Sequence, residues 1–520
     1  MNKQIFSISA LISVLIISGL AYLILGTGLH GDDYIEIVKM SNFSYAEFFY
    51  PSPYIHNHYV LGLPAHYFLF WAYKFLGYEY LFAYDLIKVL SHGMCIWFIF
   101  KFLQDYLPKD RALLGSVLFI LYPLHDSTTY WYMALVYIIP ASLIAYSCHL
   151  LVHNAWIRSF IIGLIGATFF YTSPPFTFGL GLIFLLQKNF KKFCFFILPG
   201  FIYVFYYLWI RSTFPFAERR INSSVDLTYY LKNLVGQVVS TIDSFFGPSF
   251  FLKIYYSIMS IEIISLGLIS ALLALLIVSK KKLSEITTTP NILIISIFGV
   301  VVISMIMFAS TGQYNHSPFN LGNRTLIYTS FLVAVLIAAY LPSSRLILVI
   351  LVSGMLLPIF GISDYWKSWN NEQKTIINSI NSSKELLEIK AMSLVIIEDN
   401  LYHKLGPFDH IEFFSMPWNV RAILEKYEQN GVEFIGLNSY LKISEDQLID
   451  TKYLTEHDIT NNIYLYNSYS DQLRRINALE LEEILSKTEA SYRHWIQGFK
   501  GTKLEEIVIR INPRLSYIFK

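Results

Sequence analysis

Long apolar runs recur along the first part of the chain, and short polar segments separate them. Residues 5–25 carry no charge, and a helix of this length crosses about 30 Å of hydrocarbon. A signal peptide is the alternative because Lys3 precedes this run, but the run is long and others follow it, so an uncleaved anchor is predicted. Ten more spans are predicted near residues 80–102, 112–124, 131–152, 157–171, 176–186, 193–210, 258–279, 292–310, 325–341 and 346–362. The pattern predicts an α-helical polytopic membrane protein with about eleven transmembrane helices.

From about Ser363 the chain becomes more polar and its pattern changes. The runs "SLVIIED" and "NNIYLYN" predict strands, and "WNVRAILEKYEQNG" predicts a helix that ends at Gly431. We therefore expect two domains: a membrane domain over residues 1–362 and a soluble α/β domain over residues 363–520.

Composition agrees with a lipid environment. Hydrophobic residues make up 55% of the 520 positions and charged residues only 15%, whereas soluble domains carry about 25% charged residues. The net charge is +2, and the one basic run, at residues 280–282, is typical of a loop anchor, so no nucleic-acid partner is expected. The three cysteines all fall in apolar runs and form neither a disulfide framework nor a metal-binding spacing.

Lysine and arginine gather in alternate short segments, among them residues 101–111, 188–192 and 280–282. The short loops between them hold only Lys39 and Arg324. By the positive-inside rule, this asymmetry predicts a multi-pass protein of the inner (plasma) membrane with a cytoplasmic N-terminus. With eleven spans, the C-terminal domain is then extracytoplasmic.

The predicted outer loops contain acids, imidazoles, aromatic residues and arginines. A carboxylate can act as a general base, arginine makes bidentate contacts with phosphate, and aromatic faces stack on sugars or settle at the bilayer interface. Together they suit a lipid phosphate that carries a polar group. The candidate residues are Asp32, Asp33 and Tyr34 in "LHGDDY", His56 and His58 in "YIHNHY", His125, Asp126 and Trp131 in "LHDSTTYW", Arg219 and Arg220 in "FAERRI", and Asn323 and Arg324 in "GNRT".

Each candidate also has a structural alternative. Asp32, Asp33 and Asp126 can cap helices, since Asp is a favoured N-cap residue. Arg324 can be a snorkelling anchor at the interface. His56, His58 and His316 lack a metal-binding spacing, and Arg219 and Arg220 fit a solvated loop.

The order of these motifs resembles the membrane-embedded GT-C glycosyltransferases, in particular the branch of protein O-mannosyltransferases and lipid A aminoarabinose transferases. In that branch the first span leads into an outer loop with an acidic pair, here Asp32-Asp33-Tyr34. A Pro- and aromatic-rich amphipathic segment follows, here "GLPAHYFLFWAYKFLGYEY", and then a second acidic motif, here His125-Asp126. The basic residue that often follows the acidic pair in those families is missing, because Tyr34 comes at once.

The resemblance implies transfer of a sugar from a polyprenyl-phosphate donor to a hydroxyl of a glycan, lipid or protein acceptor at the outer face of the bilayer. No cofactor is required, although an acidic pair can bind a divalent cation. The implied catalytic residues are Asp32, Asp33 and Asp126; the implied phosphate-binding residues are Arg324, Arg219 and Arg220; and the implied substrate-binding residues are Tyr34, His56, His58, His125, Trp131 and Asn323.

Three other functions are weighed against this one. An O-antigen-type polysaccharide polymerase is also polytopic, but it does not need an acidic pair directly after the first span. A lipid or glycan transporter predicts mid-membrane ionisable residues and inverted repeats. A non-enzymatic membrane scaffold leaves the polar outer motifs unexplained.

Overall fold

The computed structural model describes residues 17–50, 62–213, 226–279, 283–286, 290–311, 316–398, 402–414, 416–428, 431–460, 462–488, 492, 494–513, 516 and 519. The chain divides into two compact units. The first contains the chain up to Gly28, Met40–Pro318 and Gly322–Trp366; the second contains Leu29–Lys39, Phe319–Leu321 and Lys367–Lys520. The division passes through the long helix α19 (Arg345–Ser382), which also contains the predicted domain boundary at residue 363.

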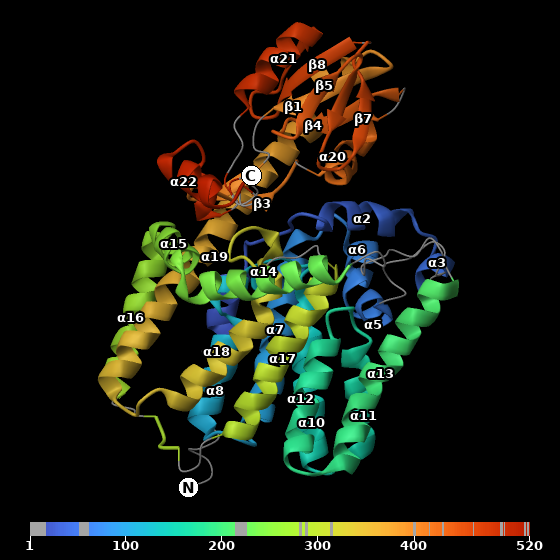
Figure 1. Ribbon diagram of the computed structural model, residues 1–520. Coiled ribbons are helices and arrows are strands. Elements are labelled where there is room, and N and C mark those ends of the chain that lie inside the picture. Colours follow the sequence, from blue (N-terminus) through green and yellow to red (C-terminus); the bar gives the residue numbers. More distant parts are fainter. Residues whose placement is uncertain are drawn as a thin grey trace. The chain divides into compact units, whose positions relative to one another are not determined.

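The first unit is helical, and most of its longer helices run alongside one another (Figure 1). Residues 17–24 are helical and lead into this unit. The longer helices are α7 (Leu81–Leu103), α8 (Lys109–Ile120), α10 (Leu135–Val152), α11 (Trp156–Ala167), α12 (Pro174–Leu186), α13 (Phe190–Thr213), α14 (Leu227–Phe246), α15 (Pro248–Met259), α16 (Ile263–Ser279), α17 (Asn291–Thr311) and α18 (Ile327–Tyr340). The short elements are α3 (Tyr45–Phe49), α5 (Leu63–Ala65), the π-helix η1 (His66–Phe70), α6 (Trp71–Leu76), η2 (Pro123–His125), α9 (Ser127–Tyr130) and η3 (Leu321–Leu326).

Each of the ten predicted spans after the first coincides with a helix, but these helices differ in length. Two adjoining helices, α15 and α16, are bent by 105° at the break between them and make one further span if they are counted together. Six helical stretches in the described part of the chain are long and apolar enough to cross a membrane: Leu81–Leu103, Leu135–Val152, Phe190–Ile210, Asn291–Thr311, Leu321–Tyr340 and Arg345–Ser382.

The prediction of eleven spans is therefore too high for the described residues. Helices α8, α11 and α12 have only 12, 12 and 13 residues, which is about 20 Å and shorter than the hydrocarbon core. The predicted run at 112–124 is cut short because α8 ends at Ile120, ahead of the turn that begins with Pro123. The first predicted span covers residues 5–25, and its part up to residue 16 lies outside the described residues.

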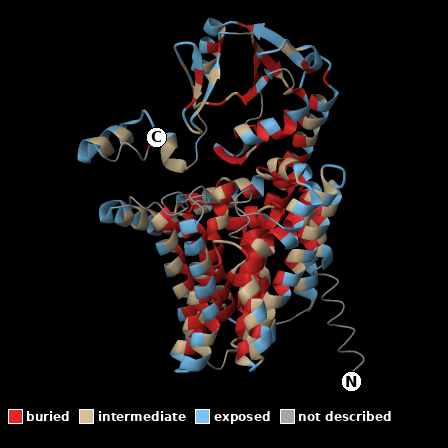
Figure 2. Ribbon diagram, turned by 90° about the vertical axis from the view of Figure 1, so that its right-hand side faces the viewer, coloured by how far each residue is buried: buried red, intermediate tan, exposed pale blue. Residues whose placement is uncertain are grey.

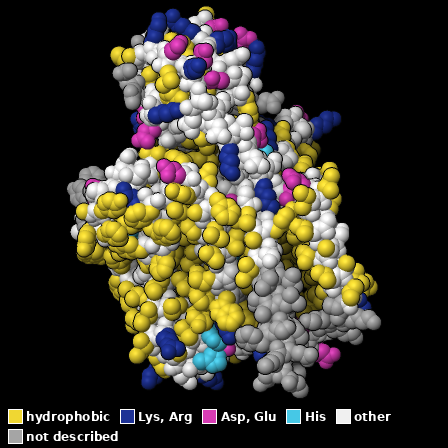
Figure 3. Space-filling model, turned by 180° about the vertical axis from the view of Figure 1, so that it is seen from behind, with side chains coloured by type: hydrophobic (Ala, Val, Ile, Leu, Met, Phe, Trp, Pro, Cys, Tyr) yellow, Lys and Arg dark blue, Asp and Glu magenta, His cyan; other side chains and the backbone are white. Residues whose placement is uncertain are grey.

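The outer surface of the first unit is rich in apolar side chains. Leu90 on α7, Phe205 on α13 and Ile263 on α16 are 63%, 68% and 86% exposed. Hydrophobic side chains cover wide areas of this unit (Figure 3), while the buried residues lie along its interior (Figure 2). Continuous exposed apolar surface of this kind is uncommon on proteins that face water. The surface therefore supports membrane association of the first unit.

Helix α14 crosses the bundle instead of running along it (Figure 1). Leu231, Val235 and Ile242 on one face are exposed, while Thr241 and Ser244 are buried. An exposed apolar stripe with a spacing of three to four residues is typical of a helix that lies in the plane of a membrane interface.

The second unit contains the strands. Its main sheet has four strands in the order β4-β1-β8-β9, in which β1 (Ser393–Glu398) is parallel to β4 (Glu433–Gly436) and β8 (Asn462–Asn467) and β9 (Gln472–Ile476) is antiparallel to β8. The other strands form a pair, β2 (Tyr402–Leu405) and β3 (Phe408–Glu412), and a three-stranded sheet, β5 (Leu441–Ser444), β6 (Gln447–Asp450) and β7 (Thr455–Asp458). The helices outside α19 are α2 (Asp33–Asn42), α20 (Pro417–Leu424), α21 (Ala478–Lys487) and α22 (Lys503–Ile511).

The strands predicted from "SLVIIED" and "NNIYLYN" are β1 and β8, which lie side by side with Val395 opposite Tyr464. The helix predicted from "WNVRAILEKYEQNG" forms as α20 and ends at Leu424, followed by a 3-10 turn over Glu425–Tyr427. The described part of the chain therefore combines a helical membrane unit with a C-terminal α/β unit.

Candidate functional site

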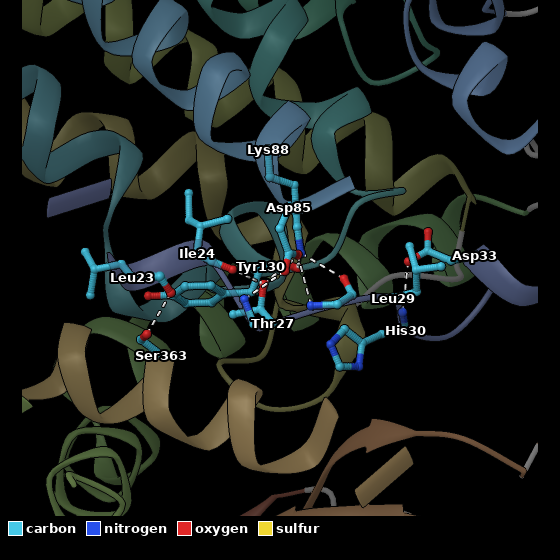
Figure 4. Close-up of polar contacts among 12 residues, drawn as sticks. Leu23, Ile24, Thr27, Leu29, His30, Asp33, Asp85, Lys88, Tyr130 and Ser363 are labelled. Carbon is cyan, nitrogen blue, oxygen red and sulfur yellow. Dashed lines mark hydrogen bonds and ion pairs between the residues drawn. The ribbon is translucent and has the colours of Figure 1, made fainter. Parts of the chain in front are cut away.

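A buried ion pair on α7 holds the turn that follows the first helix. Lys88 Nζ lies 2.8 Å from Asp85 Oδ1, and neither residue is more than 4% exposed. The same ammonium donates to Thr27 Oγ1 at 2.7 Å and to the carbonyl oxygens of Gly28 and Tyr130, each at 2.8 Å (Figure 4). One lysine thus connects α7, the first turn and the end of α9.

The carboxylate of Asp85 completes this contact from the other side. Its Oδ2 accepts the backbone N–H of Gly26 at 2.8 Å, and its Oδ1 accepts that of Gly28 at 3.0 Å. Both glycines have positive φ angles, 90° and 68°, a conformation that side chains disfavour. The predicted site did not include this pair. The signal was two opposite charges three residues apart inside a predicted span, where ionisable residues are rare.

The adjacent acids Asp32 and Asp33 have different environments in the second unit. Asp33 is fully buried, and its Oδ2 accepts the backbone N–H of His30 at 2.9 Å. This bond reaches back from the first residue of α2 to the loop ahead of the helix, as the carboxylate of a capping box does. Asp32 is partly exposed, and its Oδ1 accepts the indole N–H of Trp418 at 2.9 Å. Of the two carboxylates, Asp32 is therefore the one with access to solvent.

Tyr34 supports the same loop. Its hydroxyl donates to the carbonyl oxygen of Leu29 at 3.1 Å, and its ring packs edge-on against Phe413, with 5.5 Å between the centroids. The side chain is 3% exposed. These contacts give Tyr34 a positioning role for the acidic loop.

Asp126 stands at the start of α9 in the first unit, and all its contacts are buried. Its Oδ1 accepts from Lys253 Nζ at 3.0 Å and from Asn323 Nδ2, and its Oδ2 accepts from the indole N–H of Trp366 at 2.7 Å. Asp126 is 1% exposed and the other three residues are 0% exposed. Because a cation neutralises the carboxylate and both of its oxygens are engaged, the geometry favours a role in connecting four stretches of chain.

Asn323 has a second partner, because its Oδ1 accepts both the backbone N–H and the hydroxyl of Ser127. Asn323 therefore binds to the start of α9 with both ends of its amide. Because Arg324 is the next residue in η3, these contacts fix the backbone from which Arg324 projects.

His125 is enclosed within its own turn. Its Nε2 lies 2.9 Å from the carbonyl oxygen of Phe119 and its Nδ1 lies 2.6 Å from Thr128 Oγ1. A carbonyl can only accept, so Nε2 carries a proton and donates it to the oxygen of Phe119. Burial lowers the pKa of His125 to about 4. The imidazole is thus neutral near pH 7, and both of its nitrogens are used within the turn.

Arg324 lies among aromatic side chains. Its Nε donates to Tyr137 Oη at 2.9 Å, and its guanidinium carbon lies 5.3 Å from the ring centre of Trp131 and 5.6 Å from that of Tyr137. Tyr137 Oη also lies 3.5 Å from the hydroxyl of Tyr171. The indole N–H of Trp131 is buried and has no hydrogen-bond partner among the described residues. The charged guanidinium of Arg324 and the indole N–H of Trp131 are therefore two hydrogen-bond donors on neighbouring side chains.

The first unit thus brings together Asp126 with Asn323, and Arg324 with Trp131, out of the predicted site. Lys253, Trp366 and Tyr137 complete these groups and were missed, because no local feature of the sequence indicates their partners. Four predicted residues lie outside the described part of the chain: Arg219, Arg220, His56 and His58.

The structure also contains a group with metal-ligating geometry that differs from the predicted acidic pair. It consists of Asp105, His149 and His153.

The chain was also compared with known proteins. No family model, no curated protein and no solved structure matches this chain.

Proposed function

We propose that this chain is a polytopic membrane glycosyltransferase. It transfers a sugar from a polyprenyl-phosphate donor to an acceptor hydroxyl at the outer face of the plasma membrane. The proposal begins from the resemblance of the loop motifs to GT-C enzymes and from the apolar surface of the first unit. The observation that carries it is the placement of Arg324 beside the buried indole N–H of Trp131.

This placement suits a phosphate ester. Trp131 and Tyr137 orient the Arg324 guanidinium through a hydrogen bond and through their ring faces. Arginine favours phosphate because its planar donors match two phosphate oxygens. A buried donor without a partner is uncommon in folded proteins, and a ligand is one explanation for it. The Trp131 indole N–H would donate to a further oxygen of the donor, and the aromatic faces would contact the sugar.

Asp32 is the carboxylate that we assign to the acceptor. It is partly exposed, whereas Asp33 is buried and bonded to its own turn. Asp32 would accept the proton of the acceptor hydroxyl as the oxygen attacks the anomeric carbon. The bond from that carbon to the phosphate oxygen breaks, and the lipid phosphate leaves as an anion that Arg324 stabilises. A phosphate is a good leaving group, so a strong general acid is not required.

Asp126 then acts as a positioning residue and not as a base. Its carboxylate holds the amide of Asn323, and Asn323 is joined directly to Arg324. The ion pair with Lys253 holds the carboxylate in place. In this proposal Asp126 affects donor binding through the position of Arg324.

Transport is the alternative that one observation favours. Asp85 and Lys88 are ionisable residues inside a candidate span, where such residues often mark a transport pathway. Here, however, the two side chains bind each other and the backbone of the first turn. These contacts favour a structural role for the pair.

The test uses the full-length protein in liposomes with a panel of polyprenyl-phosphate hexoses and pentoses and the lipid extract of the host as acceptor. We expect one donor to lose its sugar in stoichiometric exchange for a glycosylated product detected by mass spectrometry. Arg324→Ala should abolish donor binding and turnover, whereas Arg345→Ala, which removes an arginine bonded to the carbonyl oxygen of Ile277, should not. Movement of intact donor across the bilayer without transfer would establish the transporter instead.

A further inference from the structure

A second polar cluster lies in the first unit, in the turn after α7 and at the end of α10. Asp105 lies two residues beyond the end of α7, and His149 and His153 lie in or next to the last turn of α10. The two histidines are four residues apart, a spacing that places them on one face of a helix. The charge pattern of the sequence predicts this end of the helices to be cytoplasmic, the side opposite the loops that carry the proposed glycosyltransferase residues.

The three side chains converge. Asp105 Oδ2 lies 2.9 Å from His149 Nδ1, and Asp105 Oδ1 lies 2.9 Å from His153 Nε2. The two imidazole rings are 4.6 Å apart between centroids. All three potential ligand atoms lie within 4.8 Å of one another.

We propose that Asp105, His149 and His153 form a binding site for a divalent transition-metal ion of the zinc class. Two imidazole nitrogens and one carboxylate oxygen are the donor set that zinc and similar ions accept in three-ligand sites. Magnesium and calcium prefer oxygen ligands alone, so they fit this set poorly. His153 is 59% exposed as a side chain, which leaves a path for the ion and room for water as a further ligand.

Binding changes the tautomer of each ring. In the metal-free cluster, a neutral imidazole donates its one N–H proton from the nitrogen that faces the carboxylate. When the ion binds, that proton passes through water to the other nitrogen of the same ring, so each imidazole stays neutral and its freed nitrogen becomes a ligand beside the carboxylate. The filled site would connect the turn after α7 to the end of α10. This consequence is independent of the proposed glycosyltransferase activity.

The second unit offers a matched control for the histidine–carboxylate contact. His457 Nδ1 lies 2.9 Å from Glu433 Oε2, the same distance as in the cluster, but with one histidine only. If an ordinary histidine–carboxylate contact sufficed for binding, His457 would contribute as much as His149 or His153.

The experiment is zinc titration of the full-length protein in detergent after chelation and removal of the chelator. We expect one zinc ion per chain by equilibrium dialysis and elemental analysis. Cobalt in place of zinc should give visible d–d absorption. His149→Gln, His153→Gln and Asp105→Asn should each weaken zinc binding at least about tenfold, while His457→Gln should leave it unchanged.

Zinc should also raise the thermal midpoint of the wild type, but not that of His153→Gln, because an ion that binds only the folded state stabilises it. Gel filtration and the metal-free thermal midpoint show whether each variant is folded, and the exposed His153 is the variant least expected to disturb folding. Zinc affinity that stays the same in folded His149→Gln and His153→Gln, or a wild type without cobalt absorption, would overturn the proposal.

Discussion

The carboxylate of Asp126 and the ammonium of Lys253 lie 3.0 Å apart in the interior of the helical unit, although 127 positions separate them in the sequence. Neither side chain is more than 1% exposed. Removing one member of such a pair leaves an uncompensated charge in a medium that solvates it poorly. Substitutions in this pair therefore test whether Asp126 has a positioning role or a catalytic role.

We expect Asp126→Asn and Lys253→Met each to lower the free energy of unfolding by about 3–5 kcal/mol. The double variant should lose less than the sum, because neither charge remains unpaired. Thermal unfolding in detergent measures both, with Glu483→Gln on an exposed pair as a control that leaves the midpoint unchanged. If Asp126→Asn kept full stability and lost only turnover, Asp126 would be a catalytic residue and not a positioning one.

Substitutions of Asp32 and Asp33 should have different effects, one on sugar transfer and the other on stability. Asp32→Asn should lower sugar transfer by about a hundredfold or more, the scale of a lost general base, without a change in the thermal midpoint. Asp33→Ala should lower the free energy of unfolding by about 1 kcal/mol, the typical cost of losing a side-chain acceptor at a helix start, because the backbone N–H of His30 loses its partner. Sugar-transfer rates and unfolding curves are measured on the same preparations of each variant. Near-normal turnover in Asp32→Asn would show that Asp32 is not the general base.

Tyr137→Phe tests how Arg324 is oriented. The variant keeps the ring beside the guanidinium but removes the hydroxyl that accepts from Arg324 Nε at 2.9 Å. A hydrogen bond to a charged group contributes about 1.5–3 kcal/mol, so donor affinity should fall about tenfold to a hundredfold. Tyr146→Phe on the same helix is the control, and donor binding measured apart from turnover is the readout. Equal donor affinities in Tyr137→Phe and Tyr146→Phe would show that the orientation of Arg324 by Tyr137 does not contribute to donor binding.

Stability should decline as the pH falls, in part because of His316. Burial lowers the pKa of His316 to about 4, and Thr241 Oγ1 lies 2.6 Å from its Nδ1. The unfolded chain takes up the proton near the ordinary pKa of about 6.5, whereas the folded chain resists protonation down to pH 4. Stability is therefore lost between these two values as the pH falls.

The variant His316→Gln should reduce this slope without abolishing it, since burial also lowers the pKa of His125 to about 4. Thr241→Val is the control, because it removes a hydrogen bond but no titrating group. Thermal midpoints from pH 7.5 to 4 give the slopes. A slope that is identical in the wild type and in His316→Gln would show that His316 becomes protonated without unfolding.

The positions of the apolar helices, of two strands and of α20 followed from the sequence alone. Each apolar run after the first coincides with a helix, and "SLVIIED" and "NNIYLYN" became the parallel neighbours β1 and β8. These features depend on hydropathy and spacing within a few residues, which are local properties of the chain. The acidic pair could also be placed after the first helix, although its two members could not be told apart.

Tertiary structure decided the lengths of the spans and the partners of the polar groups. The bend of 105° between α15 and α16 and the short helix α8 depend on what each segment packs against. Asp126 contacts Lys253 and Trp366, which lie 127 and 240 positions away in the sequence. Arg324 contacts Trp131 and Tyr137, which lie 193 and 187 positions away. A buried charge must be paired where it lies in space, and the helix that supplies its partner is chosen by packing of the whole bundle, which no local pattern encodes.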